Sequence, residues 1–432
     1  MRTPFSWISR DGRVIILAAG LRSFGAGFAA VVLGVYLGGL GLTLGQIGAF
    51  FTAGVAGSAL LTFGIGLLDG KISRRSLFIG VTLLQALPVA ALVLSDNFAV
   101  LAVASFIGAI TGASGRGPVQ PLEQASLAVA AEPSRRTNVF AVYRIVSTFA
   151  AAAGSLAAGL APLISHAFGV SDLAGQKAML VAFAGCLLAA EALYLLVSHE
   201  IEAPRAEGTG WTSPLKLKSR RIILTLSALF SVDNFAGSLI VQSLVAYWFN
   251  TRFGFELGSL AGIFFVSNVL AAVSLWVAAK LADRIGLINT MVFTHIPASI
   301  FLIAAAFAPM GWLAVLFWQA RSFFSQMDVP TRDSYTMAIV SPEERVAMAS
   351  IHLTGRSIAG AAGPVVATAL WQSVSAAAPF VACGAIKIVY DLSLWAMFKD
   401  VKTPEEANRP RPELSPTASP PPRAGGSPVE TL

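Results

Sequence analysis

The chain has 432 residues, of which 55% are hydrophobic and 12% are charged, and its formal net charge is +7. A soluble domain carries about 25% charged residues, so this composition excludes a soluble enzyme or a soluble binding protein. The low charged fraction indicates that lipid surrounds most of the chain. The positive net charge does not indicate nucleic-acid binding, because the basic residues follow a membrane pattern.

Twelve apolar stretches are long enough to form spanning helices, each of which needs about 20 residues. In chain order they are 14–37, 45–68, 76–94, 98–122, 138–163, 177–198, 222–249, 259–282, 287–308, 312–339, 346–372 and 379–398. Their high Ala, Gly and Leu content favours helices over a membrane barrel. The sequence therefore predicts an all-α membrane protein with twelve transmembrane helices.

The longest polar interval between predicted helices divides the chain into two sets of six. We predict an N-terminal six-helix bundle at 1–198, a cytoplasmic linker at 199–221 and a C-terminal six-helix bundle at 222–402. The remaining residues, 403–432, are polar and rich in proline, which predicts a disordered cytoplasmic tail.

The two halves resemble each other in sequence. Pro121, Pro133 and Arg136 recur 209 residues later in the chain, as Pro330, Pro342 and Arg345. The repeated segments lead from predicted helix 4 into helix 5 and from helix 10 into helix 11. Parallel six-helix repeats with a site between them at the membrane midplane are a transporter architecture.

Basic residues are distributed unevenly between the two sides of the predicted helices. With a cytoplasmic N-terminus, sixteen basic residues before the tail lie in inner segments, and the outer loops carry Lys177 and Arg252. This positive-inside bias predicts a plasma (inner) membrane protein with both termini in the cytoplasm. The first apolar stretch is too long for a signal peptide, so we expect it to be a retained helix.

A short motif lies between predicted helices 8 and 9. The segment from Leu281 to Gly286 reads L-A-D-R-I-G, with Asp283 and Arg284 at its centre. It resembles the G-x-L-A-D-R-x-G-R-R signature of the major facilitator superfamily. The resemblance implies twelve helices in two pseudo-symmetric bundles, and a membrane transporter.

A degenerate copy of the motif lies between predicted helices 2 and 3. It contains Asp69, followed by Arg74 and Arg75. An acid at a helix end can interact with the positive N-terminus of a neighbouring helix. The family resemblance implies that Asp69 faces the start of helix 11 and that Asp283 faces the start of helix 5. Both motifs are therefore predicted cytoplasmic gates, with Arg74, Arg75, Arg284 and Gly286 as their other members.

Five ionisable residues are predicted near the membrane midplane, where insertion costs at least ~2.5–3.5 kcal/mol each. At ~1.5 Å per residue, Arg22 lies about 13 Å beyond Arg13 and Asp233 about 18 Å beyond Arg221, in a core ~30 Å thick. The family resemblance implies that helices 1, 4, 7 and 10 line a central cavity. We predict a substrate and coupling site made of Arg22, Asp233, Arg321, Arg144 and Arg356, with Arg22 as the resting partner of Asp233. The alternative is that these residues only hold helices together.

Other ionisable residues receive structural interpretations. Four of them are expected to form gate salt bridges near the cytoplasmic ends of helices 4 and 10: Glu123, Asp328, Arg332 and Asp333. Lys387 and Asp391 have the i, i+4 spacing of an intrahelical pair on helix 12. His295 and His352 are each expected to be packed polar residues, because neither has metal-ligand spacing.

The predicted function is secondary active transport of a small organic solute by alternating access. The predicted midplane residues are four arginines and one aspartate, and this excess of +3 favours an anionic solute bound by arginine forks. Proton-coupled export is the preferred mode, and an uptake symporter or a facilitator of a metabolite is the alternative. A non-transporting receptor or scaffold is the alternative of another class, and a membrane-embedded enzyme is disfavoured because no catalytic cluster is present in the sequence.

We expect no cofactor, no catalytic residue and no metal site, and a proton as the coupling ion. The two cysteines, Cys186 and Cys383, lie inside apolar stretches and are expected to be small core residues. Gly70 and Lys71 lack the glycine and hydroxyl neighbours of a phosphate-binding loop, so no nucleotide is predicted. The expected partners are a small-molecule substrate and the lipid bilayer, without nucleic acid, and the protein is expected to be a monomer.

Overall fold

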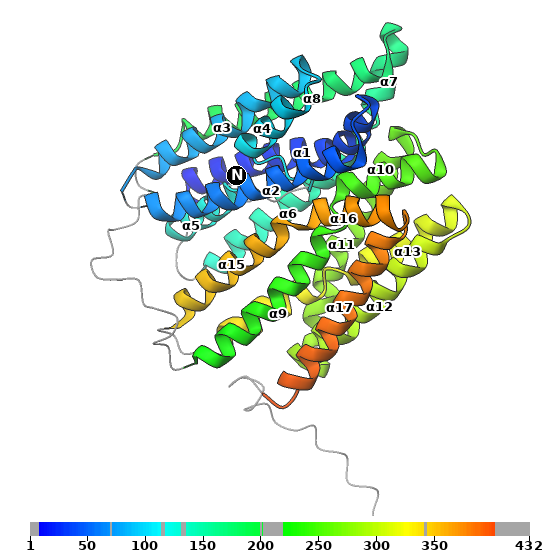
Figure 1. Ribbon diagram of the computed structural model, residues 1–432. Helices are drawn as coiled ribbons and strands as arrows, with labels where there is room; N and C mark the ends of the chain where they lie inside the picture. Colours follow the sequence, from blue (N-terminus) through cyan, green and yellow to red (C-terminus); the bar gives the residue numbers. More distant parts are fainter. Residues whose placement is uncertain are drawn as a thin grey trace, which may run out of the picture.

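The computed structural model describes residues 8–69, 71–113, 117–130, 135–198, 201, 219–340 and 344–401 (Figure 1). All regular structure in these residues is helical, apart from one isolated bridge between Asp69 and Ile72. The predicted tail lies outside the described residues, as does the predicted linker except for Ile201 and residues 219–221. The bundle boundaries at 198 and 222 therefore stay predictions.

Nine spans among the described residues are long and apolar enough to cross a bilayer. They are formed by α1 (Arg10–Gly39), α2 (Leu44–Leu68), α3 (Arg74–Leu94), α6 with α7 (Arg136–Ala157 and Leu160–Phe168), α8 (Asp172–Tyr194), α9 with α10 (Arg220–Ser238 and Gln242–Phe253), α11 (Leu257–Ile285), α12 (Leu287–Phe307) and α17 (Ala378–Phe398).

Three further spans are interrupted near their middle. They are α4 with α5 (Phe98–Gly108 and Gln120–Ala130), α13 with α14 (Gly311–Phe324 and Asp328–Ala338), and α15 with α16 (Arg345–Ala361 and Gly363–Ser373). Together with the nine spans above they give the predicted twelve, and the predicted fold class of two six-helix bundles is confirmed. Figure 1 shows the first bundle, α1–α8, lying beside the second, α9–α17.

The interruptions follow from local sequence. After α4 ends at Gly108, the backbone turns through Ala109 at φ +52° and Gly112 at φ +67°. Positive φ values disfavour continued helix, and a glycine adopts them without steric cost. The segment ends where α5 begins at Gln120, one residue before Pro121. This break lies within a predicted continuous helix, 98–122, so α5 extends the fourth span beyond the predicted end.

The predicted internal repeat appears as matched helix starts. Helix α6 begins at Arg136 and α15 begins at Arg345, which keeps the offset of 209 residues. Helices α5 and α14 each carry the repeated proline, Pro121 or Pro330, in their first turn. Proline fits there because the first helical N–H groups have no acceptor inside the helix.

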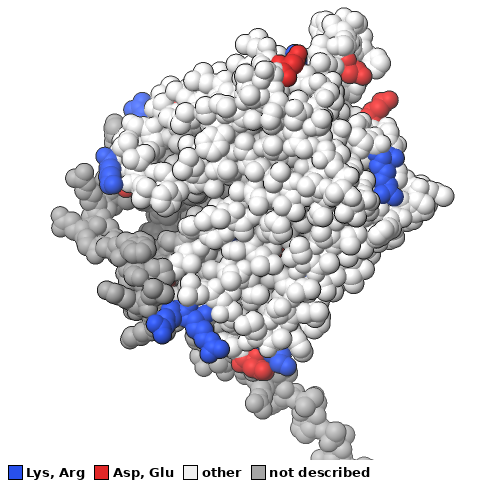
Figure 2. Space-filling model, in the orientation of Figure 1, with Lys and Arg blue, Asp and Glu red and all other residues white. Residues whose placement is uncertain are grey.

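The charge distribution agrees with a membrane environment. Figure 2 shows that the Lys, Arg, Asp and Glu atoms visible on this face gather at its two ends, with a wide band of uncharged atoms between them. Large apolar side chains such as Leu87, Leu94 and Phe149 are more than half exposed in this protein. In water such a surface would be unfavourable, so the band is a lipid-facing surface.

Three buried apolar clusters show how the bundles meet. We call the end where α1 begins and α17 ends the terminus side, and the end where α1 and α10 finish the far side. One cluster joins both bundles, with Phe28 of α1 and Trp248 of α10 among its members. Two others belong to one bundle each, around Phe78 in the first and Phe230 in the second. The bundles therefore share a core toward the far side and have separate cores toward the terminus side.

Contacts on the far side depend on a glycine. Ser243 of α10 donates its backbone N–H to the Gly112 carbonyl at 3.0 Å and its hydroxyl to the Ala30 carbonyl at 2.7 Å. A Cβ at Gly34 would stand 2.0 Å from the Ser243 carbonyl oxygen, which is closer than any real Cβ contact. Only glycine therefore lets α1 and α10 approach each other as they do here.

This contact yields a conformational prediction. Gly34→Val should weaken the far-side closure, because overpacking a tight contact costs about 1–3 kcal/mol. A Cβ at Gly45 of α2 would lie 3.6 Å from Oε1 of Gln372 in α16, so this pair reports on closure. With Gly45→Cys and Gln372→Cys introduced together, a short cross-linker should join the bundles readily, and adding Gly34→Val should lower the yield severalfold.

The matched control is Gly64→Val on α2, where a Cβ would meet nothing within 4 Å. It should leave the cross-linking yield unchanged. Equal yields in the Gly34→Val and Gly64→Val backgrounds would show that the glycine contact does not hold the far side closed.

Candidate functional site

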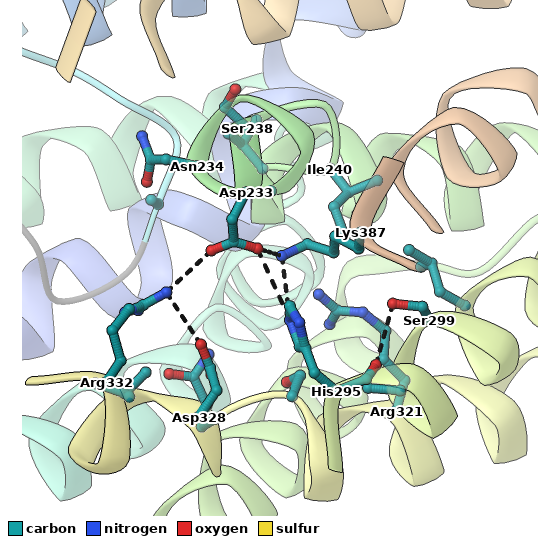
Figure 3. A pocket seen from close by; sticks show the side chains of 18 of the residues that line it. Asp233, Asn234, Ser238, Ile240, His295, Ser299, Arg321, Asp328, Arg332 and Lys387 are labelled. Atoms are coloured by element: carbon teal, nitrogen blue, oxygen red, sulfur yellow. Dashed lines mark hydrogen bonds and ion pairs between the residues drawn. The ribbon is translucent and has the colours of Figure 1, made fainter. Parts of the chain in front are cut away.

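A cavity of about 320 Å³ lies inside the second bundle, and we call it the main cavity. Its polar lining includes Asp233, His295, Arg321, Arg332 and Lys387 (Figure 3). Among the described residues that line it, Ala113 alone comes from the first bundle. The main cavity is therefore a polar site buried in an apolar bundle, as expected of a ligand or ion site.

Asp233 of α9 lies at the centre of the charged residues. Its Oδ1 atom lies 2.5 Å from the Lys387 Nζ atom of α17, and its Oδ2 atom lies 3.0 Å from Nη1 of Arg332 in α14. The residue is 5% exposed. A buried carboxylate needs opposite charges and hydrogen bonds to stay ionised, and the two cations supply both.

Two further acidic residues and a histidine complete the arrangement. His295 of α12 contacts the Asp391 carboxylate through Nδ1 at 3.0 Å and the Lys387 Nζ atom through Nε2 at 3.2 Å. Asp328 pairs with Arg332 at 3.0 Å. These six residues, which we call the acid–base cluster, are Asp233, His295, Asp328, Arg332, Lys387 and Asp391. The cluster connects four helices, so a change of charge at one member affects the others through short contacts.

Arg321 of α13 differs from the basic members of the cluster. Its guanidinium stacks on the Trp318 ring at 4.6 Å, and in the described part of the chain it makes no ion pair. Figure 3 shows it pointing into the main cavity beside His295. A half-buried guanidinium without a carboxylate is energetically unfavourable at membrane depth, so Arg321 is the group in this cavity best placed to bind an anion.

Arg356 of α15 also lines the main cavity. Its Nη2 atom donates to the Asn234 side-chain oxygen at 3.3 Å, and its carbonyl accepts from the Asn234 amide at 2.7 Å. This double contact ties α15 to α9. Three of the five predicted site residues, Asp233, Arg321 and Arg356, thus lie together around one cavity.

A second buried ion pair occupies the first bundle. Arg22 of α1 binds Glu123 of α5 through two hydrogen bonds of 2.9 and 3.3 Å. The hydroxyl groups of Tyr143 and Tyr194 also donate to Glu123, at 2.7 and 2.6 Å. Glu123 is fully buried and Arg22 is 4% exposed. This pair is satisfied by neighbouring side chains and borders only a small space of about 40 Å³.

The prediction that Arg22 is the resting partner of Asp233 is therefore wrong. Arg22 pairs with Glu123 inside the first bundle, and Asp233 pairs with Lys387 and Arg332 inside the second. Counting residues along the predicted helices placed both Arg22 and Asp233 near the membrane midplane. Depth alone, however, does not show which helices are neighbours.

The predicted gate role of Glu123, Asp328 and Arg332 stays a prediction, and their salt bridges lie inside single bundles. All three are buried and bound to the midplane residues Arg22 or Asp233, directly or through one another. Helix α5 extends the fourth span to Ala130, beyond the predicted end at residue 122, so Glu123 lies inside the span. Helix α14 ends at Ala338, next to the predicted end at residue 339. The side chain of Asp333 lies outside what the structure describes.

The predicted intrahelical pair of Lys387 and Asp391 is not formed either. Lys387 reaches across to Asp233, and Asp391 reaches across to His295. These residues were missed as site residues because their i, i+4 spacing was sufficient to interpret them as an intrahelical pair. The position of Lys387 and Asp391 inside a predicted span could have identified them, since ionisable residues in any span are functional candidates.

Arg144 lies apart from the main cavity. It lines a separate space of about 190 Å³ between α6 and α11, which we call the side pocket. The predicted single site of five residues is thus divided among the main cavity, the side pocket and the sealed Arg22 pair.

The predicted gate motifs form local structures on the terminus side. Asp69 makes two hydrogen bonds with Arg74, at 3.0 and 3.1 Å, and Arg74 also donates to the Ile201 carbonyl at 3.0 Å. Arg75 donates to the Leu195 carbonyl at 2.7 Å. The described contacts of Asp69 thus lie within the first bundle, and its predicted approach to helix 11 stays a prediction.

The second motif ends α11. Asp283 and Arg284 are exposed in its last turn. Gly286 has φ +83° and separates α11 from α12, which explains why a glycine stands at this position. The predicted contact of Asp283 with the start of helix 5 stays a prediction.

The comparisons with known proteins agree with this fold. The family model described as Major Facilitator Superfamily matches residues 15–327. An uncharacterized membrane protein of Saccharomyces cerevisiae is 22% identical, over 94% of this chain and 98% of its own length. The crystal structure of the nucleoside transporter NupG has a TM-score of 0.71 at 15% identity and covers 90% of this chain and 99% of its own. The inward open xylose transporter XylE from E. coli has a TM-score of 0.68 at 13% identity, over 91% and 98%.

The sealed pair in the first bundle yields a stability prediction. Glu123→Gln should lower the free energy of unfolding by about 3–5 kcal/mol, because it leaves the buried Arg22 without a counter-charge. The double variant Arg22→Met with Glu123→Leu should recover most of that loss. Thermal unfolding of the purified protein measures both effects.

Glu191→Gln is the matched control, because Glu191 is buried in α8 and pairs with no described basic residue. It should change stability little. If Glu123→Gln were as stable as the parent but inactive in transport, the pair would be functional rather than structural.

Proposed function

The chain belongs to the Major Facilitator Superfamily and is a membrane transporter; we propose that it is a proton-coupled secondary transporter of a small organic anion. The observation that supports the anion is Arg321, a basic side chain that points into the main cavity with no described carboxylate partner. An anionic group of a solute would supply that partner in a bidentate way.

The charge of the main cavity supports the same proposal. Its described lining contains four basic residues, Arg321, Arg332, Arg356 and Lys387, and two acidic residues, Asp233 and Asp328. Asp391 lies behind this lining and contacts His295. With a neutral histidine, an excess of positive charge remains, and a bound anion would reduce it.

Proton coupling is proposed for Asp233. Its two cationic partners hold it in the charged form in the resting arrangement. Protonation would weaken both ion pairs and free Lys387 and Arg332 for other partners, including a solute. A group whose protonation changes the contacts between α9, α14 and α17 can link proton movement to a change in bundle shape.

The shared core on the far side and the separate cores on the terminus side support alternating access. If the terminus side is cytoplasmic, as the basic residues predict, this conformation is open to the cytoplasm. The plasma (inner) membrane location, a monomeric state and an export direction belong to the same proposal. Uptake by symport is the alternative to export. Measuring solute transport under imposed pH gradients of each polarity distinguishes these two modes.

The first test is charge selectivity in proteoliposomes. A panel of labelled carboxylates should be transported in preference to a lipophilic cation such as tetraphenylphosphonium. Arg321→Gln should reduce anion affinity about tenfold or more, and Arg321→Lys should have a smaller effect because it keeps the charge but loses the fork. A preference for the cation, with Arg321→Lys behaving as the parent, would overturn the anion proposal.

The second test separates proton coupling from binding. Asp233→Asn should abolish accumulation driven by a pH gradient, because the residue can no longer exchange a proton. It should retain solute exchange at equal pH, since exchange needs no net proton movement. Retained exchange also shows that the variant is folded.

Glu191→Gln again serves as the control, as an ionisable residue in a span outside the main cavity. It should keep gradient-driven accumulation. Full accumulation by Asp233→Asn would remove this residue from the coupling mechanism.

A further inference from the structure

The side pocket shares a wall with the main cavity. Gln326, in the turn between α13 and α14, lines both spaces. The side pocket is about 190 Å³ in volume and lies between the bundles. Its floor is tied across the bundles by Asn268 of α11, whose amide donates to the Ser155 hydroxyl of α6 at 3.1 Å.

The lining of the side pocket suits an anionic group. It contains Arg144 and no acidic residue, together with neutral polar side chains: Gln120, Ser147, Thr148, Asn268 and Gln326. In the described residues Arg144 makes neither a hydrogen bond nor an ion pair, and its side chain is exposed to the pocket. A planar guanidinium surrounded by neutral donors is a typical binding arrangement for a carboxylate.

The main cavity by itself lacks one requirement of a transport site. A ligand shifts a conformational equilibrium only if it binds the two states with different free energies. When two bundles move relative to each other, that difference arises most directly from a ligand that contacts both. The main cavity offers Ala113 as its described contribution from the first bundle, whereas the side pocket offers Arg144 and four polar or aromatic neighbours from α5 and α6.

We propose that the side pocket is the first-bundle half of the solute site and that the solute carries two separated anionic groups. One group binds Arg321 in the main cavity, and the other binds Arg144 in the side pocket. The Gln326 side chain lies between them and contacts the middle of the solute. This proposal rests on the proposed function, because it assumes that Arg321 binds an anion.

Depth supports the pairing of the two arginines. Arg144 lies eight residues after the start of α6 on the terminus side, about 12 Å along the helix. Arg321 lies ten residues after the start of α13 on the far side, about 15 Å along that helix. Both values are close to half of a core ~30 Å thick. These counts place both arginines near the middle of their spans, on opposite bundles.

The test uses the purified full-length protein and unbranched dicarboxylates of four to eight carbons, each compared with the monocarboxylate of equal length. Apparent dissociation constants come from thermal stabilisation as a function of ligand concentration. One dicarboxylate length should bind the parent protein more tightly than its monocarboxylate by about tenfold or more, the effect of one added charge-assisted contact.

Substitutions of the two arginines show which residue binds which anionic group of the solute. Arg144→Gln should remove the advantage of the dicarboxylate and leave monocarboxylate binding unchanged, and Arg144→Lys should restore part of it. Arg321→Gln should weaken both ligands. Arg13→Gln, at an exposed position of α1 outside both spaces, is the control and should change neither.

The outcomes separate this inference from the proposed function. If Arg321→Gln weakens monocarboxylate binding while Arg144→Gln leaves both ligands unchanged, the anion site stands and the two-anion inference is overturned. If no dicarboxylate binds the parent more tightly than its monocarboxylate, the inference also fails. If no carboxylate binds and the lipophilic cation is transported instead, the proposed function fails with it.

Discussion

The second bundle depends on one interaction, the contact of the Asp233 carboxylate with Lys387 and Arg332. These three groups come from α9, α17 and α14, and each would be strongly unfavourable alone at membrane depth. Together they neutralise one another in part and bring three helices to a common point. His295 and Asp391 extend the contacts to α12. Asp233, Lys387, Arg332 and His295 all line the main cavity, so the charge of this space depends on the state of Asp233.

The two bundles carry residues of opposite charge at one repeated position. Glu123 and Arg332 are separated by the repeat offset of 209 residues, and each pairs with a residue of opposite sign on the first helix of its bundle. The pair in the first bundle is sealed by two tyrosine hydroxyls, whereas the pair in the second borders a cavity. A fully satisfied ion pair mainly fixes structure, and one that borders a cavity can exchange partners. We therefore propose a structural role for the first pair and proton coupling for the second.

Much of the fold could be predicted from sequence, because spanning helices follow from apolar length alone and the bundle repeat from the spacing of prolines and arginines. The site was harder to predict. Asp233, Arg321 and Arg356 were found from depth, since charge in a membrane is rare and costly. Their partners were not, because only the packing of helices decides whether Arg22 or Lys387 meets Asp233. The breaks at Gly108 and Ser325 also interrupt the rise of the fourth and tenth spans, which a count along a straight helix does not include.

The central claim is that anion binding and the protonation of the acid–base cluster are linked through Asp233. The most direct measurement is titration calorimetry of the purified protein with its best-bound carboxylate, in two buffers of different ionisation enthalpy at one pH. A linked site makes the observed heat depend on the buffer, which reports net proton uptake or release per anion bound. We expect a clear buffer dependence in the parent protein that disappears in Asp233→Asn. Tight binding with the same heat in both buffers, at every pH between 5 and 8, would contradict it.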